Sequence, residues 1–214
     1  MSARPRASGR ATSYTPGMDR RSLLLALALM PLARAAAAAV NVSAVEGYLA
    51  GLRSAQGSFR QTNPNGSVQT GRFYLQKPGR IRFEYDAPKG AMVIADGTWV
   101  GVFDPKSNRN PTRYPLDKTP LGLLLRDRLS LTEPGLVLGA TQDANGIDIT
   151  VVDPRAPDSG RMVMTFSPAP VALKQWEITT KAGARTRVVL TGVTTNISLD
   201  PSLFNIELAA ARYP

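Results

Sequence analysis

The residue types that carry most enzymatic chemistry are either missing from this chain or scattered along it. The 214 residues include no cysteine and no histidine, so the chain offers no thiol nucleophile, no imidazole base and no Cys/His metal site. It also lacks a phosphate-binding glycine loop and the Gly-x-Ser-x-Gly signature of serine hydrolases. Carboxylates remain for acid–base work, and the most prominent are Glu84, Asp86, Asp96, Asp104, Asp148 and Asp153.

These carboxylates lie mostly where strands are expected to end or turn, and an aspartate in such a position normally hydrogen-bonds nearby backbone. A carboxylate pair for glycoside hydrolysis can be assembled from distant strands, so a carboxylate-dependent exported enzyme remains the weaker alternative. We predict that the protein is not an enzyme and that it uses no cofactor and no metal.

The elements that would position any site are mainly strands. Residues 71–103 are expected to form four strands, separated by turn signals at 77–79, 87–90 and 96–97. Apolar residues two apart share one phase of the first two strands: Phe73, Leu75, Ile81, Phe83 and Tyr85. Charged residues occupy the other phase: Arg72, Arg80, Arg82 and Glu84. The stretch therefore predicts a meander with one apolar face and one charged face.

Two helices are expected to interrupt the strands. Residues 42–53 carry apolar side chains at helical spacing, with Ser43 as the expected cap. Residues 119–129 begin with Thr119 as a cap and Pro120 at the first helical position, and this helix is apolar almost all round. Such a helix must be buried on more than one side, and a plug of the core is the simplest interpretation.

Further strands are expected along the rest of the chain, at 57–62, 108–115, 136–142, 146–152, 161–167, 173–180 and 186–194, with a short final strand at 205–208. About eleven short strands and two helices predict a mainly β fold, a strongly curved antiparallel sheet or partial barrel.

The first 39 residues have the layout of a cleavable signal peptide. A charged start at Met18 precedes the apolar run 22–32 and a series of Ala-x-Ala cleavage options. Arg20 and Arg21 leave both the Sec route and the twin-arginine route open. Loss of this segment, with six arginines and one aspartate, would lower the net charge from +10 to +5. We expect an exported, monomeric protein with one domain over 40–214 and no nucleic-acid partner.

Several motifs together resemble the LolA family of periplasmic outer-membrane lipoprotein carriers. They are Gly-Ser-Phe-Arg-Gln at 57–61, Gly-Arg-Phe-Tyr-Leu-Gln-Lys-Pro-Gly-Arg-Ile-Arg-Phe-Glu-Tyr at 71–85, Ile-Ala-Asp-Gly-Thr-Trp-Val at 94–100, Tyr-Pro-Leu at 114–116 and Thr-Pro-Leu-Gly-Leu-Leu-Leu at 119–125. The resemblance runs over residues 42–208 and is densest between 58 and 125. It implies an unclosed barrel of antiparallel strands whose apolar concave face is covered by a helical lid. In such carriers, this face receives the acyl chains of lipoproteins.

The resemblance also implies roles for individual residues. The lipid cavity would be lined by Phe73, Leu75, Ile81, Phe83, Tyr85, Met92, Ile94, Trp99, Phe103, Met162, Met164, Phe166, Val188 and Leu190. The lid would consist of Val45, Leu49, Leu52, Pro120, Leu121, Leu124 and Leu125. Lys77 stands where the family carries an arginine that latches the lid through backbone carbonyls. A lysine ammonium is a point charge and not a planar fork, so a differently shaped latch is expected.

The implied partners are acylated lipoproteins, an inner-membrane ABC transporter that releases them, and a LolB-like acceptor at the outer membrane. A regulatory module of the same fold that senses stray lipoproteins is the alternative function.

Overall fold

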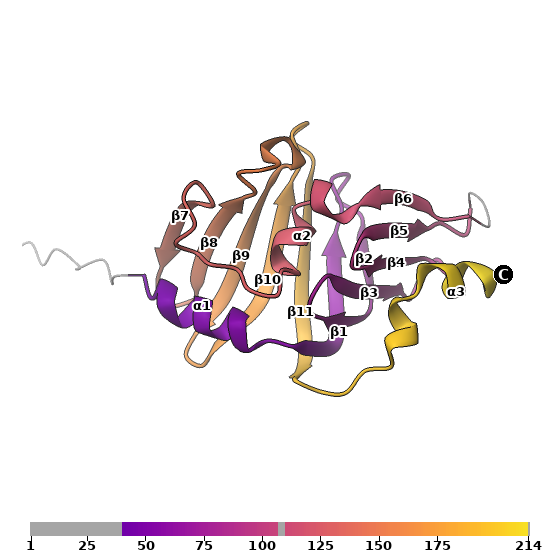
Figure 1. Ribbon diagram of the computed structural model, residues 1–214, viewed down its shortest axis with the longest axis horizontal. Coiled ribbons are helices and arrows are strands. Elements are labelled where there is room, and N and C mark those ends of the chain that lie inside the picture. Colours follow the sequence, from indigo (N-terminus) through magenta and orange to yellow (C-terminus); the bar gives the residue numbers. More distant parts are fainter. Residues whose placement is uncertain (1–39, 107–109, 214) are drawn as a thin grey trace, which may run out of the picture. The chain divides into compact units, whose positions relative to one another are not determined.

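The computed structural model describes residues 40–106 and 110–213, and its main element is an eleven-stranded antiparallel sheet (Figure 1). The strand order is β6-β5-β4-β3-β2-β1-β11-β10-β9-β8-β7, so β6 and β7 are the two edges of an open sheet. The mainly β, open-sheet prediction is confirmed. The strands are β1 (Ser54–Thr62), β2 (Val68–Gln76), β3 (Arg80–Tyr85), β4 (Met92–Asp96), β5 (Trp99–Phe103), β6 (Thr112–Pro115), β7 (Val137–Gln142), β8 (Ile147–Val152), β9 (Arg161–Pro168), β10 (Val171–Thr179) and β11 (Arg185–Thr195).

The predicted leader at 1–39 lies outside the described residues, as do positions 108 and 109 of the edge strand expected at 108–115. None of the described helices is long and apolar enough to cross a membrane.

The two phases predicted for β2 and β3 are confirmed by the register of these strands. Phe73 lies opposite Phe83 and Leu75 opposite Ile81, while Arg72 lies opposite Glu84 on the other face. The pairing of β1 with β11 joins the N-terminal strands to the C-terminal ones, so the apolar face is continuous across both halves of the sheet.

Two helical segments cover this apolar face. The helix α1 (Val42–Gly51) contacts β10. The turn η1 (Leu116–Lys118) and the short helix α2 (Leu121–Leu124) belong to the connection that leads from edge strand β6 to edge strand β7. Val45 and Leu49 of α1 and Leu123 and Leu124 of α2 lie in the same hydrophobic cluster as the sheet residues, and Figure 1 shows both helices on one side of the sheet.

The helix predicted at 119–129 is much shorter than expected. The Thr119 hydroxyl donates to the Leu116 carbonyl, 2.8 Å away, and does not cap a helix. The Leu125 carbonyl accepts from the amide of Gly79 on a neighbouring turn, 2.8 Å away, where a continuing helix would need it internally. One helical turn therefore remains, followed by irregular chain.

Two further local predictions were wrong. Asn41, and not Ser43, caps α1, because its Oδ1 accepts from the Ala44 amide at 3.1 Å. The final strand expected at 205–208 is a helix, α3 (Ile206–Ala211), which starts because Asn205 Oδ1 accepts from the Leu208 amide at 2.8 Å. The alanines that follow favour helix over strand.

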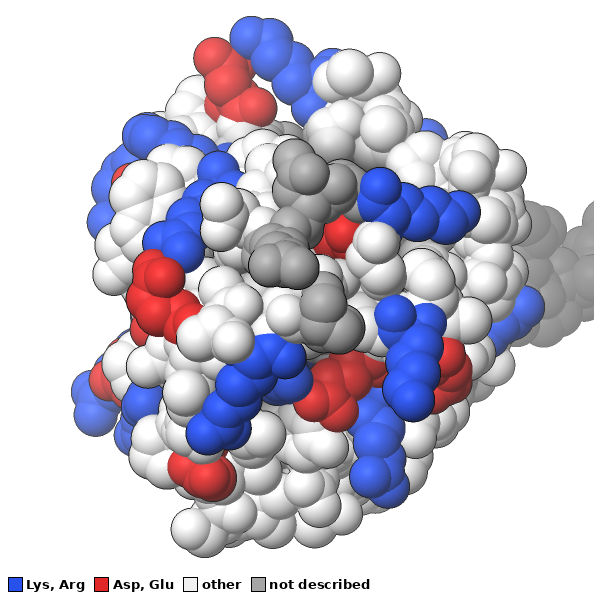
Figure 2. Space-filling view, turned by 90° about the vertical axis from the view of Figure 1, so that its right-hand side faces the viewer, with Lys and Arg blue, Asp and Glu red and all other residues white. Residues whose placement is uncertain are grey.

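The helix α3 covers the opposite face of the sheet at β4 and forms a second, small apolar cluster there. Charges of both signs are interspersed over this end of the molecule, where Figure 2 shows Lys/Arg and Asp/Glu side chains next to one another. The pair between Arg113 of β6 and Glu207 of α3, 2.7 Å apart, is one example.

Candidate functional site

The apolar face of the sheet holds one continuous hydrophobic cluster. Ten of the fourteen residues predicted for the cavity lie in it or pack against it, namely Phe73, Leu75, Ile81, Phe83, Tyr85, Met162, Met164, Phe166, Val188 and Leu190. Two aromatic residues outside the prediction join them, Phe59 on β1 and Trp176 on β10. Their rings meet Phe83 at centroid distances of 5.0 Å and 6.2 Å. The shared phase of Trp176 and Ile178 on one strand was the signal that could have identified Trp176.

Four residues predicted for the cavity lie elsewhere: Met92, Ile94, Trp99 and Phe103. Apart from Trp99, which is 41% exposed, they pack against Ile206 or its neighbours on α3. Ala95 and Val100 face the interior in their place, since successive residues of a strand alternate between its faces. The prediction failed because β4 and β5 are apolar on both faces, and their periodicity alone does not say which face is inside.

The predicted lid residues close the interior. Val45, Leu49, Leu52, Leu124 and Leu125 are at most 3% exposed within the same cluster as the sheet, Leu121 packs against it, and Pro120 is buried next to α2. The Tyr48 ring of α1 meets the Phe166 ring of β9 edge to face, with centroids 6.0 Å apart. Leu123, which the prediction left out, is also buried there. The side chains of α1 and α2 thus fill the space above the sheet.

Lys77, the predicted latch, is buried at the end of β2 with an exposed fraction of 6%. Its Nζ donates to the carbonyl of Leu49 in α1 at 3.0 Å, and its backbone amide donates to the Arg53 carbonyl at 2.8 Å. Burial lowers the pKa of Lys77 to about 8, because desolvation penalises the ammonium more than the carboxylate of Asp127 favours it. The side chain thus places a donor, and a costly charge, directly under the lid.

The same turn also holds the segment after α2. Gly79 donates its amide to the Leu125 carbonyl at 2.8 Å. A glycine is required there, because φ is +75° and a Cβ would lie 2.7 Å from the Cα of Gly97. An exposed ion pair between Arg53 and Asp127, 2.6 Å long, links the end of α1 to the segment after α2. The β2–β3 turn is therefore in contact with both parts of the lid.

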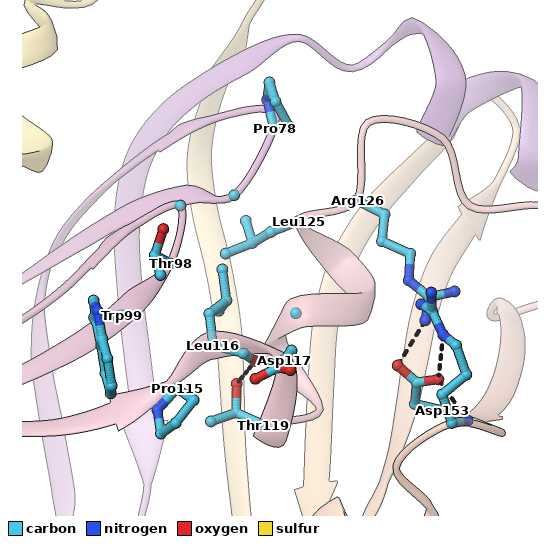
Figure 3. Close-up of a pocket in the computed structure, with 14 residues that line it drawn as sticks. Pro78, Thr98, Trp99, Pro115, Leu116, Asp117, Thr119, Leu125, Arg126 and Asp153 are labelled. Atoms are coloured by element: carbon cyan, nitrogen blue, oxygen red, sulfur yellow. Dashed lines mark hydrogen bonds and ion pairs between the residues drawn. The ribbon is translucent and has the colours of Figure 1, made fainter.

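A cavity of about 440 Å³ opens beside α2, between this turn, the β4–β5 turn and the loop after β8 (Figure 3). Trp99 stands on one side of it, and Arg126 with Asp153 on the other, while Leu116 and Leu125 lie between them. Leu116 and Leu125 also belong to the interior cluster. The cavity is thus separated from the interior by side chains of the connection between β6 and β7.

The polar side of this cavity is an ion-pair network that the sequence did not predict. Arg126 donates to Asp153 at 2.6 Å and to Glu133 at 3.1 Å, and Asp153 also accepts from the amide and the Nε of Arg155, at 3.0 Å and 3.4 Å. Burial by itself would raise the pKa of Asp153, but the Arg155 amide and the Arg126 guanidinium outweigh it and hold that pKa below its ordinary value.

The other conspicuous carboxylates mostly serve the local backbone or a neighbouring side chain. Asp96 accepts from the amides of Thr98 and Trp99, both at 2.8 Å, and Glu84 pairs with Arg82 at 2.7 Å. Over residues 40–106 and 110–213, the acidic side chains form no group of three that could hold a metal ion.

Comparison with protein-family models gives a match to the outer membrane lipoprotein carrier protein LolA, over residues 50–207. An outer-membrane lipoprotein carrier protein of Methylibium petroleiphilum is 28% identical over 170 residues, covering 76% of this chain and 82% of the relative. Its counterpart in Azotobacter vinelandii is 24% identical over 196 residues, covering 88% and 94%. The crystal structure of a LolA superfamily protein from Nitrosomonas europaea aligns with a TM-score of 0.43 at 12% identity, covering 78% of this chain and 98% of that one.

Proposed function

Because this chain belongs to the LolA family, we propose that it is a carrier that binds the acyl chains of lipoproteins and catalyses no reaction. The observation that carries the proposal is the apolar interior, whose cover is not a second sheet. It consists of α1 and the one-turn α2, and the side-chain and backbone hydrogen bonds of one turn reach both. In this proposal the helical cover opens and admits acyl chains to the apolar interior.

The free energy of transferring an acyl chain out of water is consistent with a covered apolar interior. A chain of ~16 carbons gains roughly 12 kcal/mol on leaving water, at ~0.8 kcal/mol per methylene. It cannot travel through water unprotected. Inside the protein it would replace the leucines of the lid, so one apolar contact is exchanged for another and the net affinity stays moderate. The methionines of β9, Met162 and Met164, add flexible thioether chains that adapt to different acyl groups.

The route of the cargo extends the proposal beyond binding. We infer that residues 1–39 are a leader removed on export, by the Sec or the twin-arginine route, and that residues 40–214 work in the periplasm. There the carrier would take lipoproteins from an inner-membrane ABC transporter and pass them to a LolB-like acceptor. Mass spectrometry of the protein recovered from the periplasmic fraction tests the leader, because an uncleaved N-terminus contradicts it.

The carrier function is tested with membranes that hold a tri-acylated lipoprotein and its releasing transporter. Addition of the purified protein and ATP should bring lipoprotein into the soluble fraction, bound to the carrier. A matched sample without ATP controls for passive leakage. If the lipoprotein stays in the membrane in both samples, the carrier proposal fails.

Binding in the apolar interior is tested by competition between lipoprotein and the apolar dye N-phenyl-1-naphthylamine. Phe83→Asp on the sheet and Leu124→Asp on α2 should each abolish the competition, because a carboxylate in the cavity excludes acyl chains. Leu138→Asp is the control, since Leu138 is 61% exposed on β7. Unchanged competition in the Phe83 or Leu124 variant would place that residue outside the binding site.

A further inference from the structure

The ion pair between Arg126 and Asp153 differs from the other ion pairs of the described residues in its burial. Its side chains are 18% and 13% exposed, and in every other pair at least one partner is more than a third exposed. At 2.6 Å it is a close charge-assisted hydrogen bond. An exposed pair contributes little, and a partly buried pair contributes more. When one partner is removed, the other keeps only its longer contact, Arg126 with Glu133 at 3.1 Å or Asp153 with Arg155 at 3.4 Å.

The pair joins two distant parts of the fold. Arg126 lies on the connection between β6 and β7, one residue after Leu125, whose carbonyl binds the β2–β3 turn. Asp153 follows β8, in the other half of the sheet order. The segment after α2 is therefore fastened to both halves of the sheet, through a backbone hydrogen bond on one side and an ion pair on the other. Figure 3 shows Arg126 reaching from this segment to Asp153 across the polar side of the cavity.

We propose that Arg126 and Asp153 form a second latch of the lid, which holds α2 closed independently of the contact between Lys77 and α1. This rests on the proposed function, in which the lid opens to admit a ligand. Lys77 binds a carbonyl of α1, and Arg126 fixes the segment after α2, so each contact acts on a different part of the lid.

Release of the second latch has a particular structural consequence. Leu116 and Leu125 separate the 440 Å³ cavity from the interior cluster. Movement of Leu125 with the freed segment would join the two spaces and open an entrance on the α2 side. Arg126 and Asp153 are therefore positioning residues, which set how often this entrance opens.

The test uses spin labels, which the absence of cysteine allows to be placed without background labelling. One pair of labels joins Arg128→Cys, after α2, to Thr194→Cys on β11. The other joins Gly47→Cys on α1 to the same β11 position, and Gly47 has open space around an added Cβ. Arg128 and Thr194 are both exposed. Pulsed electron paramagnetic resonance then gives one distance distribution for each part of the lid.

Arg126→Gln and the isosteric Asp153→Asn should each raise the long-distance population of the α2 pair roughly tenfold, and leave the α1 pair unchanged. Lys77→Met should raise the long-distance population of the α1 pair and leave the α2 pair unchanged. Arg126→Lys should give an intermediate result, because it keeps the charge but loses the planar fork. Lys181→Gln, which breaks the exposed pair with Asp158, is the matched control and should move neither distance.

Two results would overturn the second latch. One is an α2 distance that stays closed in both the Arg126→Gln and the Asp153→Asn protein, at unchanged circular dichroism. The other is movement of both distances together in every variant, which would mean that the lid opens as one body. The double variant should open no further than either single one if the two residues act as a pair. These distances need no lipoprotein, so their outcome is separate from that of the transport experiment.

Discussion

The two helical parts of the proposed lid cover the same apolar interior but are built in different ways. α1 has ten residues, a side-chain cap from Asn41 and its own ladder of backbone hydrogen bonds. α2 has four residues and no side-chain cap. A single helical turn does not persist by itself, because nucleation fixes several residues for one hydrogen bond. A helix of ten residues is also marginal by itself in water, so both parts depend on packing against the sheet, and α2 depends more strongly on the bonds from its neighbours.

The contacts that fasten the two parts differ accordingly. α1 receives one buried donor, Lys77, at a carbonyl of its last turn. The segment after α2 is held at its backbone by Gly79 and at its side chain by Asp153. The regular helix needs few external bonds and the irregular segment needs several, so we expect substitutions in the two parts to differ in their effects on stability and on opening.

The largest expected effect comes from truncating one buried leucine in each part. Leu49→Ala should lower the free energy of unfolding by ~4 kcal/mol, because Leu49 is fully buried in a rigid helix and leaves a cavity. Leu124→Ala should cost less, ~2 kcal/mol, because the irregular segment around it can collapse into the space. Urea denaturation followed by tryptophan fluorescence measures both. Equal costs would mean that α2 is as rigid as α1.

The next effect concerns Lys77 and pH. Since its folded pKa is about 8 and that of an unfolded lysine is near 10.5, the unfolded chain binds more protons between these values, and stability must rise with pH there. The free energy of unfolding should rise by roughly 1 to 2 kcal/mol between about pH 8 and pH 9.5, relative to Lys77→Met. Titration of tyrosines affects both proteins alike, so the difference between them isolates Lys77.

Lys77→Arg provides the matched control for this pH dependence. A guanidinium stays charged throughout this range, so the arginine protein should show no such rise. A rise in the arginine protein equal to that of the wild type would assign the effect to another group. The lysine in this chain thus adds a dependence on alkaline pH that an arginine at the same position would lack.

The sequence predicted the inner face of a strand correctly where the two faces of that strand differ in polarity. β2 and β3 alternate apolar with charged residues, so Phe73 and Phe83 could be placed inside and Arg72 outside. β4 and β5 are apolar on both faces, because α3 covers the outer one, and Ile94 and Phe103 were placed on the wrong side. Because α3 was predicted as a strand at 205–208, nothing in the sequence indicated that a helix would cover the outer face of β4 and β5.

The lid was predictable to a different degree in its two parts. α1 has helical spacing, and its position followed from it. The end of α2 is decided by the Gly79 amide, a tertiary contact that no local pattern reports. The pair of Arg126 and Asp153 joins residues 27 apart, and Asp153 was interpreted only as a turn residue. Asp153 does bind the local backbone, because its Oδ1 accepts from the Arg155 amide. Its Oδ2 accepts from Arg126, and no local pattern reports that contact.

A smaller effect is expected at the two helix caps. Asn41→Ala should cost ~1 kcal/mol and raise the hydrogen-exchange rates of the first amides of α1 about fivefold, because one N-terminal donor loses its acceptor. Asn205→Ala removes the equivalent bond of α3, on the opposite face, and should affect the amides of α3 alone. Faster exchange in α2 of the Asn41 protein would show that the two parts of the lid are coupled.

The smallest effect should come from the ion pair that links the two parts directly. Arg53 and Asp127 are 55% and 56% exposed, so water and salt screen their 2.6 Å contact. Arg53→Gln should change the free energy of unfolding by less than ~0.5 kcal/mol, and that change should vanish in 1 M salt, where the screening length is about 3 Å. Urea denaturation at low and high salt measures it. A larger or salt-independent cost would mean that the pair couples α1 to the segment after α2, and that the lid then moves as a single body.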